Sequence, residues 1–461
     1  MQEPLDTDVA IVGAGVVGCA IARELSHFDL RVTLLEAGPD VGAGTSKANT
    51  ALLHTGFDAK PGTLEARLVP RGFELLSEYA GRVGIPVEHT GALLVAWNEE
   101  QLAEFPGIVE RAHANGYRAI AEVGMEELYR REPQLGPGAC GALEVPDEAL
   151  VCPFTTPLAY ATEAVLAGCD LRRSTPVTAV DHLDTGGFRL NMPAGALRTR
   201  YLVNAAGLHS DDLDRMLGHE RFTVTPRRGE LIVFDKLARP LVEHIVLAVP
   251  TKITKGVLIA PTVFGNVMLG PTADDVERKD DTESTADGIA YLRAEGARIV
   301  PKLLEHEVTA VYAGLRAATE HVDYQLSVHA PEGYACVGGI RSTGLSASMA
   351  IAEHVRDELG AAGLQLEPRS APPPEFVMPN IGERSDRPYQ RRDLIDSDAD
   401  YGRIVCFCER VTRGEVRDAM DGPLPAVDLD GLRRRTRAHM GRCQGFFCGA
   451  ELTELLEAEN G

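Results

Sequence analysis

The sequence predicts an α/β protein in three parts: a parallel-sheet unit first, a mixed or antiparallel layer in the middle, and a small α-rich unit at the C-terminus. A buried strand, a glycine-rich turn, a helix and a second strand follow one another up to Glu36. Segments of alternating apolar and polar residues fill the middle of the chain. A proline-rich stretch then precedes four clustered cysteines. A length of 461 residues also favours more than one domain.

The N-terminal unit has the pattern of a βαβ motif, which implies a parallel sheet. We expect strands over 8–13 and 30–36 and a helix over 16–26. The turn between them has the GxGxxG spacing that allows a tight turn, close approach of backbone to a pyrophosphate, and helix–strand packing. An acid ending the second strand accepts hydrogen bonds from a ribose hydroxyl. The predicted contacts of this Rossmann-like crevice are Gly13, Ala14, Gly15, Val16, Val17, Gly18 and Glu36.

Three later segments favour FAD over NAD. A hydroxyl-rich loop over 44–49 is placed to bind the pyrophosphate from its second side. Small residues over 204–207 end an apolar strand and leave room for a bulky cofactor. A glycine-rich turn over 338–346 precedes a helix over 347–359, whose dipole favours negative charge on a reduced flavin. The predicted contacts here are Thr45, Ser46, Asn49, Leu53, Val177, Ala206, Gly207, Gly339, Arg341, Thr343, Gly344, Leu345 and Ser346.

The middle of the chain is expected to supply a wall facing the substrate. Residues 229–234 have the alternation of a strand in an antiparallel sheet. We place FAD-binding segments at about 1–75, 150–220 and 330–365, and a substrate cap at about 76–149 and 221–329. A proline-rich linker is expected over 366–400. A C-terminal domain over 401–461 completes the chain.

Four of the nine cysteines are clustered, and the other five are scattered singly. The scattered ones suit reduced core cysteines better than a disulfide framework. The cluster has the pattern CxC, a gap of 34 residues, then CxxxxC, which is unusual for structural zinc and fits a [2Fe–2S] cluster better. A zinc-binding interaction module remains an alternative. The predicted metal ligands are Cys406, Cys408, Cys443 and Cys448.

Arginines over 433–437 precede the second cysteine pair. They either neutralise an anionic cluster or form a solvated basic face. The sixty-residue unit itself buries too little apolar surface to be secure alone, so we expect a metal to stabilise it.

These segments carry a family resemblance. The chain resembles the D-amino-acid-oxidase-like FAD-dependent oxidoreductases, and within them it is similar to the glycerol-3-phosphate dehydrogenase large subunits and, more distantly, to the L-2-hydroxyglutarate dehydrogenases. This implies a GR2-type FAD-binding domain. Arg341 departs from the family pattern, which usually has an uncharged polar residue. Segments 405–415 and 436–445 resemble the bacterioferritin-associated-ferredoxin-like domain. The other matching segments are 13–18, 45–56, 226–230, 254–256, 270–272, 314–316 and 338–346.

The resemblance also implies candidate catalytic residues. His54 stands where the family places a histidine near the flavin ring, and imidazole is a common general base. Arg316 matches an arginine that contacts substrate, and its planar fork suits a carboxylate or phosphate. Lys255 matches a segment that approaches the flavin or the substrate oxygen. The alternatives are that His54 fills the pocket wall or links to the flavin, and that Arg316 forms a surface salt bridge.

The predicted function is oxidation of a small, anionic alcohol such as glycerol 3-phosphate, with electrons passing from FAD to the [2Fe–2S] cluster and on to a partner protein or subunit. A 2-hydroxy acid or an amine or imino acid are alternative substrates, and a non-catalytic electron-transfer subunit is an alternative role. The net charge of −22 argues against nucleic acid as a partner.

We expect a cytoplasmic protein, because the sequence has no transmembrane run and no signal peptide at its N-terminus. Membrane association is then expected only through a partner.

Overall fold

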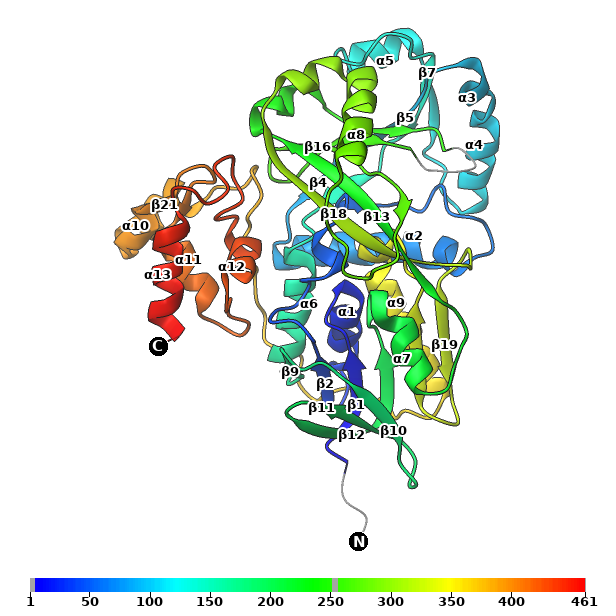
Figure 1. Ribbon diagram of the computed structural model, residues 1–461, viewed down its shortest axis with the longest axis vertical. Helices are drawn as coiled ribbons and strands as arrows, with labels where there is room; N and C mark the ends of the chain where they lie inside the picture. The colour runs from blue at the N-terminus through cyan, green and yellow to red at the C-terminus, as the bar shows by residue number, and fades with distance from the viewer. Residues whose placement is uncertain (1–4, 251–255, 461) are drawn as a thin grey trace.

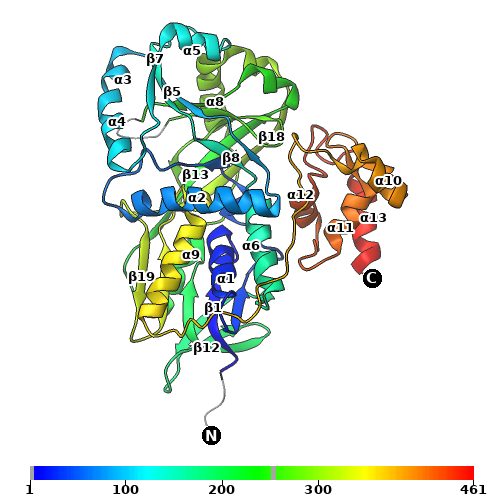
Figure 2. The same ribbon diagram turned by 180° about the vertical axis from the view of Figure 1, so that it is seen from behind.

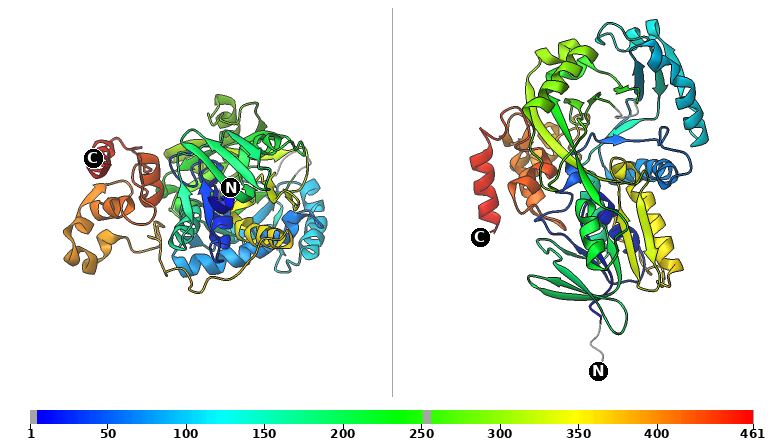
Figure 3. Two further views of the ribbon diagram at one scale, coloured as in Figure 1. Left: turned by 90° about the horizontal axis from the view of Figure 1, so that it is seen from below. Right: turned by 45° about the vertical axis from the view of Figure 1, so that its right-hand side comes forward.

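The computed structural model describes residues 5–250 and 256–460. Two sheets form the upper and lower parts of an elongated main body, and the C-terminal domain lies beside that body (Figure 1). The same arrangement is seen from behind (Figure 2), and a view from below places the C-terminal domain against one flank (Figure 3).

The lower sheet contains the predicted βαβ unit. β1 pairs in parallel with both β2 and β12, and β20 extends the parallel part beyond β12. The strand order is β10-β11-β12-β1-β2-β9, with β20 beside β12 and β19 beside β20. Its strands are β1 (Thr7–Val12), β2 (Val32–Leu35), β9 (Asp170–Arg172), β10 (Ala179–His182), β11 (Phe188–Met192), β12 (Gly195–Asn204), β19 (Gln325–His329) and β20 (Tyr334–Gly338).

The turn after β1 depends on two glycines. Gly13 has φ +103°, and a Cβ there would lie 2.5 Å from the carbonyl oxygen of Ala205 on the loop after β12. A Cβ on Gly18 would lie 1.8 Å from the carbonyl oxygen of Gly13. The first glycine therefore permits the turn, and the second permits α1 to pack against it, as the sequence predicts.

Helices cover the lower sheet. α1 packs against both α6 and α9, and α2 packs against α9 at the boundary between the two sheets. Buried side chains of these helices and of β1 and β2 form the largest apolar core. The helices of this part are α1 (Val16–Leu25), α2 (Leu64–Val83), α6 (Thr155–Leu166), α7 (Ser210–Met216) and α9 (Gly344–Ala361).

The upper sheet is largely antiparallel, which confirms the expected mixed cap. Its order is β17-β13-β16-β15-β14-β5-β7-β6, with β18 paired along β13. The strands are β5 (Ala92–Ala96), β6 (Ala121–Gly124), β7 (Gly141–Val145), β13 (Val224–Phe234), β14 (Ile245–Ala248), β15 (Leu258–Pro261), β16 (Val267–Gly270), β17 (Asp274–Asp275) and β18 (Val308–Thr319). The helices are α3 (Glu99–Ala103), α4 (Phe105–Ala114), α5 (Met125–Arg131) and α8 (Ala286–Ile299).

A small third sheet joins the two parts. It consists of β3 (Leu52–Leu53), β8 (Ala149–Val151) and β4 (Val87–Glu88), with β8 in the centre. β8 lies at the boundary between the two large sheets (Figure 2), and β3 pairs with it in antiparallel fashion.

The segment 366–400 runs along the main body. Its backbone bonds to that body at Arg369 and Met378, and the short helix α10 (Arg392–Ser397) lies within it. The C-terminal domain then contains β21 (Ile404–Cys406), β22 (Val411–Thr412), α11 (Arg413–Met420), α12 (Leu429–Thr436) and α13 (Gly449–Asn460). Among the residues described, no helix combines the length and the apolar character needed to cross a membrane.

Candidate active site and cysteine centre

A cavity of about 470 Å³ lies where the two large sheets meet. The glycine turn, the loop after β2, β13, β18 and the turn before α9 all contribute to its wall. Of the residues predicted from the sequence, those that line it are Gly15, Val16, Val17, Thr45, Ser46, Asn49, His54, Gly207, Arg316, Gly339, Arg341, Gly344 and Leu345.

The pyrophosphate end of the cavity has the open backbone that the motif predicts. A Cβ on Gly15 would meet only Ser46 Oγ, at 3.3 Å, within 4 Å. That hydroxyl accepts a hydrogen bond of 2.9 Å from the N–H of Val16, at the start of α1. Thr45 Oγ1 donates to the carbonyl oxygen of Leu315 at 2.8 Å and so ties the loop to β18. A helix N-terminus that lines the cavity beside an open glycine suits a dinucleotide phosphate.

Glu36 lies behind this turn. Its Oε2 accepts from the N–H of Ala14 at 2.7 Å and its Oε1 from the N–H of Gly38 at 2.8 Å. Burial raises the pKa of Glu36 even though these N–H groups oppose the change. The carboxyl group is thus fixed at the end of β2, where the sequence places a ribose-binding acid.

Several other predicted cofactor contacts stand behind the cavity wall. Ser346 Oγ accepts from the N–H of His54 at 2.8 Å, and Thr343 Oγ1 donates to Glu65 Oε1 at 2.8 Å. Val177 packs against the core beneath β10, β11 and β12. Contact of these residues with the cofactor remains a prediction. The predicted residues that do not line the cavity are Gly13, Ala14, Gly18, Glu36, Leu53, Val177, Ala206, Thr343 and Ser346.

His54 follows β3 and lines the cavity. Its Nδ1 lies 3.1 Å from Oε2 of Glu148, whose side chain has no exposed surface. Sequence reasoning did not single out Glu148, because a glutamate preceding a short strand has no distinguishing pattern.

Arg316 projects from β18 into the cavity beside Gly229 of β13. Its NH1 donates to the carbonyl oxygen of Thr272 at 3.2 Å. Within the described ranges, no carboxylate forms an ion pair with it, so the alternative of a surface salt bridge does not match its contacts. Burial lowers the pKa of Arg316 to about 10, and the neighbouring charge of Arg227 adds to the effect.

Two further arginines line the same cavity and were missed by sequence reasoning. Arg111 comes from α4, and Arg227 comes from β13, where Asp275 pairs with it at 2.6 Å. The segment containing Arg227 was noted only for its resemblance, and the helical pattern around Arg111 does not reveal where its side chain points. Lys255, the remaining predicted catalytic residue, lies outside the described residues.

The four clustered cysteines form two neighbouring pairs. Burial raises the pKa of Cys448 to about 12, with Cys406 beside it as a second cause, and burial likewise raises the pKa of Cys408, which neighbours Cys443. Burial acts to raise the pKa of Cys443 as well. The pKa of Cys443 is nevertheless lowered overall, because backbone N–H groups over 445–447 point at its sulfur.

This arrangement differs from a single-metal site. In the described part of the chain, the cysteine sulfurs form no group of three within 4.8 Å. A tetrahedral zinc with Zn–S bonds of about 2.3 Å would gather all four sulfurs more closely than that. Two pairs of cysteines suit two irons of a [2Fe–2S] cluster.

The arginines before the second cysteine pair have a role that sequence analysis did not predict. Arg434 and Arg435 on α12 both pair with Asp40, at 2.7 and 2.6 Å, and the Asp40 side chain is fully buried. Asp430 on the same helix pairs with Lys47 at 3.0 Å. These two arginines therefore fasten the C-terminal domain to the loop after β2, rather than forming a solvated basic face.

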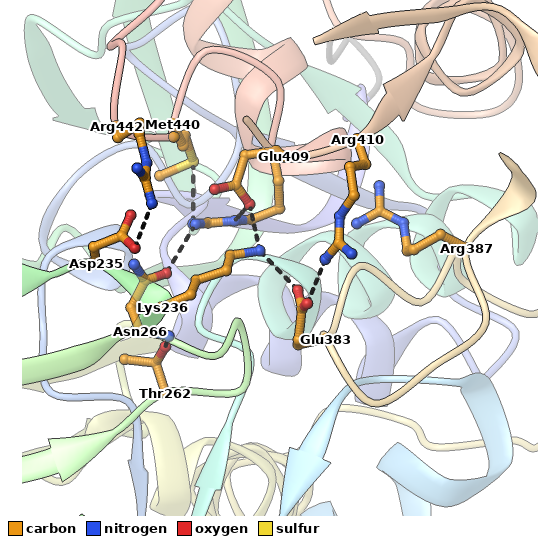
Figure 4. A network of polar contacts seen from close by, with 12 residues as sticks. Asp235, Lys236, Thr262, Asn266, Glu383, Arg387, Glu409, Arg410, Met440 and Arg442 are labelled. Carbon is orange, nitrogen blue, oxygen red and sulfur yellow. Dashed lines mark hydrogen bonds and ion pairs between the residues drawn. The ribbon is translucent and has the colours of Figure 1, made fainter. Parts of the chain in front are cut away.

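A second group of polar contacts joins the C-terminal domain to the cap (Figure 4). Arg442 pairs with Asp235 at 2.7 Å, and Lys236 pairs with Glu409 at 3.2 Å and with Glu383 at 2.7 Å. Glu409 directly follows Cys408, one of the predicted metal ligands. In addition, the guanidinium of Arg437 lies 4.0 Å from the ring centroid of Phe264 in the cap and 3.4 Å from Glu409.

Comparison with known proteins assigns a family to each part of the chain. Residues 8–358 match the family described as FAD dependent oxidoreductase, and residues 404–458 match the BFD-like [2Fe-2S] binding domain. A glycerol 3-phosphate dehydrogenase of Caloramator mitchellensis is 35% identical over 98% of this chain and 94% of its own. One subunit of the anaerobic glycerol-3-phosphate dehydrogenase of Escherichia coli is 26% identical over 100% of this chain and 89% of its own.

A solved structure resembles the main body. The L-alpha-glycerophosphate oxidase of Mycoplasma pneumoniae, in a dithionite-reduced form with FAD bound, superposes with a TM-score of 0.77 at 28% identity. The match covers 81% of this chain and 99% of the oxidase.

Proposed function

This chain belongs to the FAD dependent oxidoreductase family and ends in a BFD-like [2Fe-2S] binding domain, and on that premise we propose that it oxidises glycerol 3-phosphate and delivers the electrons to its own iron–sulfur cluster. The resemblance to glycerol 3-phosphate dehydrogenases over nearly the whole chain supports this substrate. The relatives support the class of reaction, oxidation at a CH–OH carbon.

One observation carries the substrate proposal: a half-buried cation in the cavity, Arg316, has no carboxylate partner among the residues that the structure describes. Arg316 lines the cavity, and its lowered pKa reflects desolvation. A ligand phosphate would supply the compensating negative charge, and the guanidinium can bind it through two parallel hydrogen bonds. Arg227 and Arg111 in the same wall add to the attraction for an anion.

The remaining groups suit the chemistry of alcohol oxidation. Bound FAD would supply the acceptor for the hydride that leaves the alcohol carbon. His54 lines the cavity and is proposed to take the hydroxyl proton. Arg316 holds the anionic end of the substrate and so fixes which carbon faces the flavin. The glycine turn and Ser46 hold the pyrophosphate.

The cluster is proposed to take the electrons one at a time toward a partner protein or subunit. Its ligands Cys408 and Cys443 are partly exposed, whereas Cys406 and Cys448 are buried. One side of the cluster site therefore faces solvent, where a partner has access. Three exposed phenylalanines, Phe407, Phe446 and Phe447, lie among the ligands.

Anaerobic flavin reduction tests this function. Holoprotein mixed with glycerol 3-phosphate should lose its oxidised-flavin absorbance, and L-2-hydroxyglutarate and L-proline should act far more slowly. His54→Ala should slow the reduction about 10²–10⁴-fold, the usual contribution of a positioned base. If no substrate bleaches a flavin that dithionite does bleach, the chain is an electron-transfer subunit instead.

Arg316→Ala should mainly weaken substrate binding, by about 10- to 100-fold, since it removes the cation that pairs with the phosphate. Arg316→Lys should retain only part of the substrate affinity, because an ammonium group cannot make the two parallel hydrogen bonds that a guanidinium makes to a phosphate. Arg228→Ala is the matched control, since Arg228 is on the same sheet but pairs with Asp281 and does not line the cavity. Equal effects of the Arg316 and Arg228 changes would contradict the assignment.

A further inference from the structure

Glu148 is a carboxylate buried at the boundary between the two large sheets. It immediately precedes β8, and β8 runs antiparallel to β3 with Leu53 opposite Ala149. His54 follows Leu53, so the next pair of residues along these strands is His54 and Glu148. The glutamate has no exposed surface and does not line the cavity, whereas His54 does.

The two oxygens of Glu148 have different surroundings. Oε1 accepts from the N–H of Thr55 at 2.8 Å and from its hydroxyl at 2.9 Å. Oε2 lies 3.1 Å from His54 Nδ1, within ion-pair distance, and within the part of the chain that the structure describes it has no hydrogen-bond partner. A buried carboxylate oxygen without a donor is costly. A hydrogen on Nδ1 of His54 would remove that cost once the ring turns it toward Oε2, over the 3.1 Å that separates the two atoms.

We propose that Glu148 is a positioning residue for the oxidation: it keeps the hydrogen of neutral His54 on Nδ1 and so makes Nε2 the nitrogen that accepts the substrate proton. The inference rests on the function proposed above. The alcohol O–H bond breaks, its proton goes to Nε2, the C–H hydrogen leaves with its electron pair to the oxidised flavin, and a carbonyl forms. The imidazolium that results lies beside the Glu148 carboxylate, which stabilises it.

The backbone around the histidine supports the same role. Ser346 Oγ accepts the N–H of His54 at 2.8 Å, and Glu148 holds the N–H of Thr55. The backbone that carries the imidazole is therefore held by hydrogen bonds at His54 and at the following residue, Thr55. The contact between Nδ1 and Oε2 then orients the ring on that main chain.

Glu148→Gln is the diagnostic change. Two donors from Thr55 require an acceptor at the Oε1 position, so the amide oxygen takes that place and the amide NH₂ faces His54. Nδ1 must then accept, and the hydrogen moves to Nε2, where it blocks proton uptake. We expect the rate of substrate-driven flavin reduction to fall about 10³–10⁴-fold, as in a triad whose aspartate becomes asparagine. Substrate dissociation should change less than about 3-fold.

The chain contains a matched control. Glu132 is 2% exposed, its Oε1 lies 2.7 Å from Nδ1 of His244, and the same oxygen accepts the N–H of His244. This second buried Glu–His pair lies in the cap, and neither member lines the cavity. Glu132→Gln should leave the reduction rate within about 2-fold, and Glu148→Asp should recover part of the rate lost in Glu148→Gln.

A Glu148→Gln protein that retains FAD and reduces it within about 3-fold of the wild-type rate overturns the proposal, as does an equal loss in Glu132→Gln. Nitrogen-15 spectra of labelled histidine give a second reading that needs no turnover. They should place the His54 hydrogen on Nδ1 in the wild type and on Nε2 in Glu148→Gln. If glycerol 3-phosphate fails as a substrate, the spectra still decide the role of Glu148, and an unchanged tautomer overturns it.

Discussion

The FAD cavity and the cysteine centre are built by different means. The cavity wall comes mainly from main chain and apolar core, because β1, β12 and α1 place the glycine turn within the largest apolar cluster of the molecule. The cysteine domain has a much smaller core, and two members of that core are the predicted metal ligands Cys406 and Cys448. The FAD cavity is therefore formed by a fold that has its own large core, whereas the cysteine centre is itself part of the small core of its domain.

The two regions also differ in how they are placed. The cap and the FAD-binding part share the small sheet of β3, β8 and β4, which fixes them through backbone hydrogen bonds. The C-terminal domain is held by charged pairs, of which Arg434 and Arg435 with Asp40 are the most buried, and by apolar contacts of Leu424 and Met440 with the main core. Buried ion pairs fix the orientation of one domain relative to the other. Removing one partner is strongly destabilising, because it leaves the other charge buried without compensation.

The largest effect is expected from a substitution in the glycine turn, which should separate FAD binding from cluster binding. Gly15 has φ −69°, which any residue can adopt, so Gly15→Val should fold but fill the space needed by the pyrophosphate. The variant should contain essentially no FAD and a normal amount of iron. Flavin absorbance and iron analysis measure both, and Gly81→Val on the exposed side of α2 is the control. A yellow protein with full flavin occupancy would contradict the placement of FAD.

Loss of the metal tests the role of the cysteine centre in the C-terminal domain. Cys443→Ser should remove the cluster, loosen the C-terminal domain and leave FAD bound, since two of the other predicted ligands, Cys406 and Cys448, belong to that domain's core and would lose their metal. Iron and sulfide should each be about two per chain in the wild type and near zero in the variant. Cys140→Ser, which changes a partly exposed cysteine outside the cluster, should keep both cofactors. Zinc at one per chain without iron would refute the [2Fe–2S] assignment.

A smaller effect is expected at the contact between the two regions. Asp40→Asn removes the buried carboxylate that pairs with both Arg434 and Arg435 across the contact, which should weaken docking of the C-terminal domain by about 3–5 kcal/mol. Flavin reduction by substrate should stay near wild type, while reduction of the cluster slows and proteolysis within 366–403 increases. Stopped-flow absorbance and limited proteolysis measure these changes.

Asp430→Asn is the control for the docking contact. Across the contact Asp430 pairs with Lys47, and both side chains are 31% exposed, so that pair should contribute no more than about 1 kcal/mol. Asp430 also pairs with Arg433 and Arg434, at 2.5 and 3.4 Å, but these contacts lie within its own helix and do not cross to the main body. Equal behaviour of the two variants would show that burial of the Asp40 pairs does not hold the domain in place.

Local patterns were enough to predict the elements that frame the cofactor. The apolar run before Gly13, the spacing of Gly13, Gly15 and Gly18, and an acid at the end of the next strand are short-range features, and the structure has β1, α1 and β2 in those places. The cysteine quartet was likewise identified by spacing, and the BFD-like match supports its ligand type.

Side-chain partners at long range were not predictable in the same way. Glu148 and His54 are far apart in sequence and meet only because β8 pairs with β3. The arginines over 433–437 have one pattern in sequence, yet burial against Asp40 gives two of them a docking role. Periodicity predicts which residues belong to the same helix or strand, but it does not predict which other helix or strand packs against that element.

The sequence by itself therefore determined the FAD crevice, the mixed cap, the α-rich iron–sulfur domain and the identity of His54 and Arg316 as candidates. Tertiary structure alone decided that Arg316 enters the cavity with no carboxylate partner among the described residues, that Arg111 and Arg227 join it, and that Glu148 lies against His54. The physical reason is that backbone preferences act over a few residues, whereas desolvation and charge depend on every group that folding brings near.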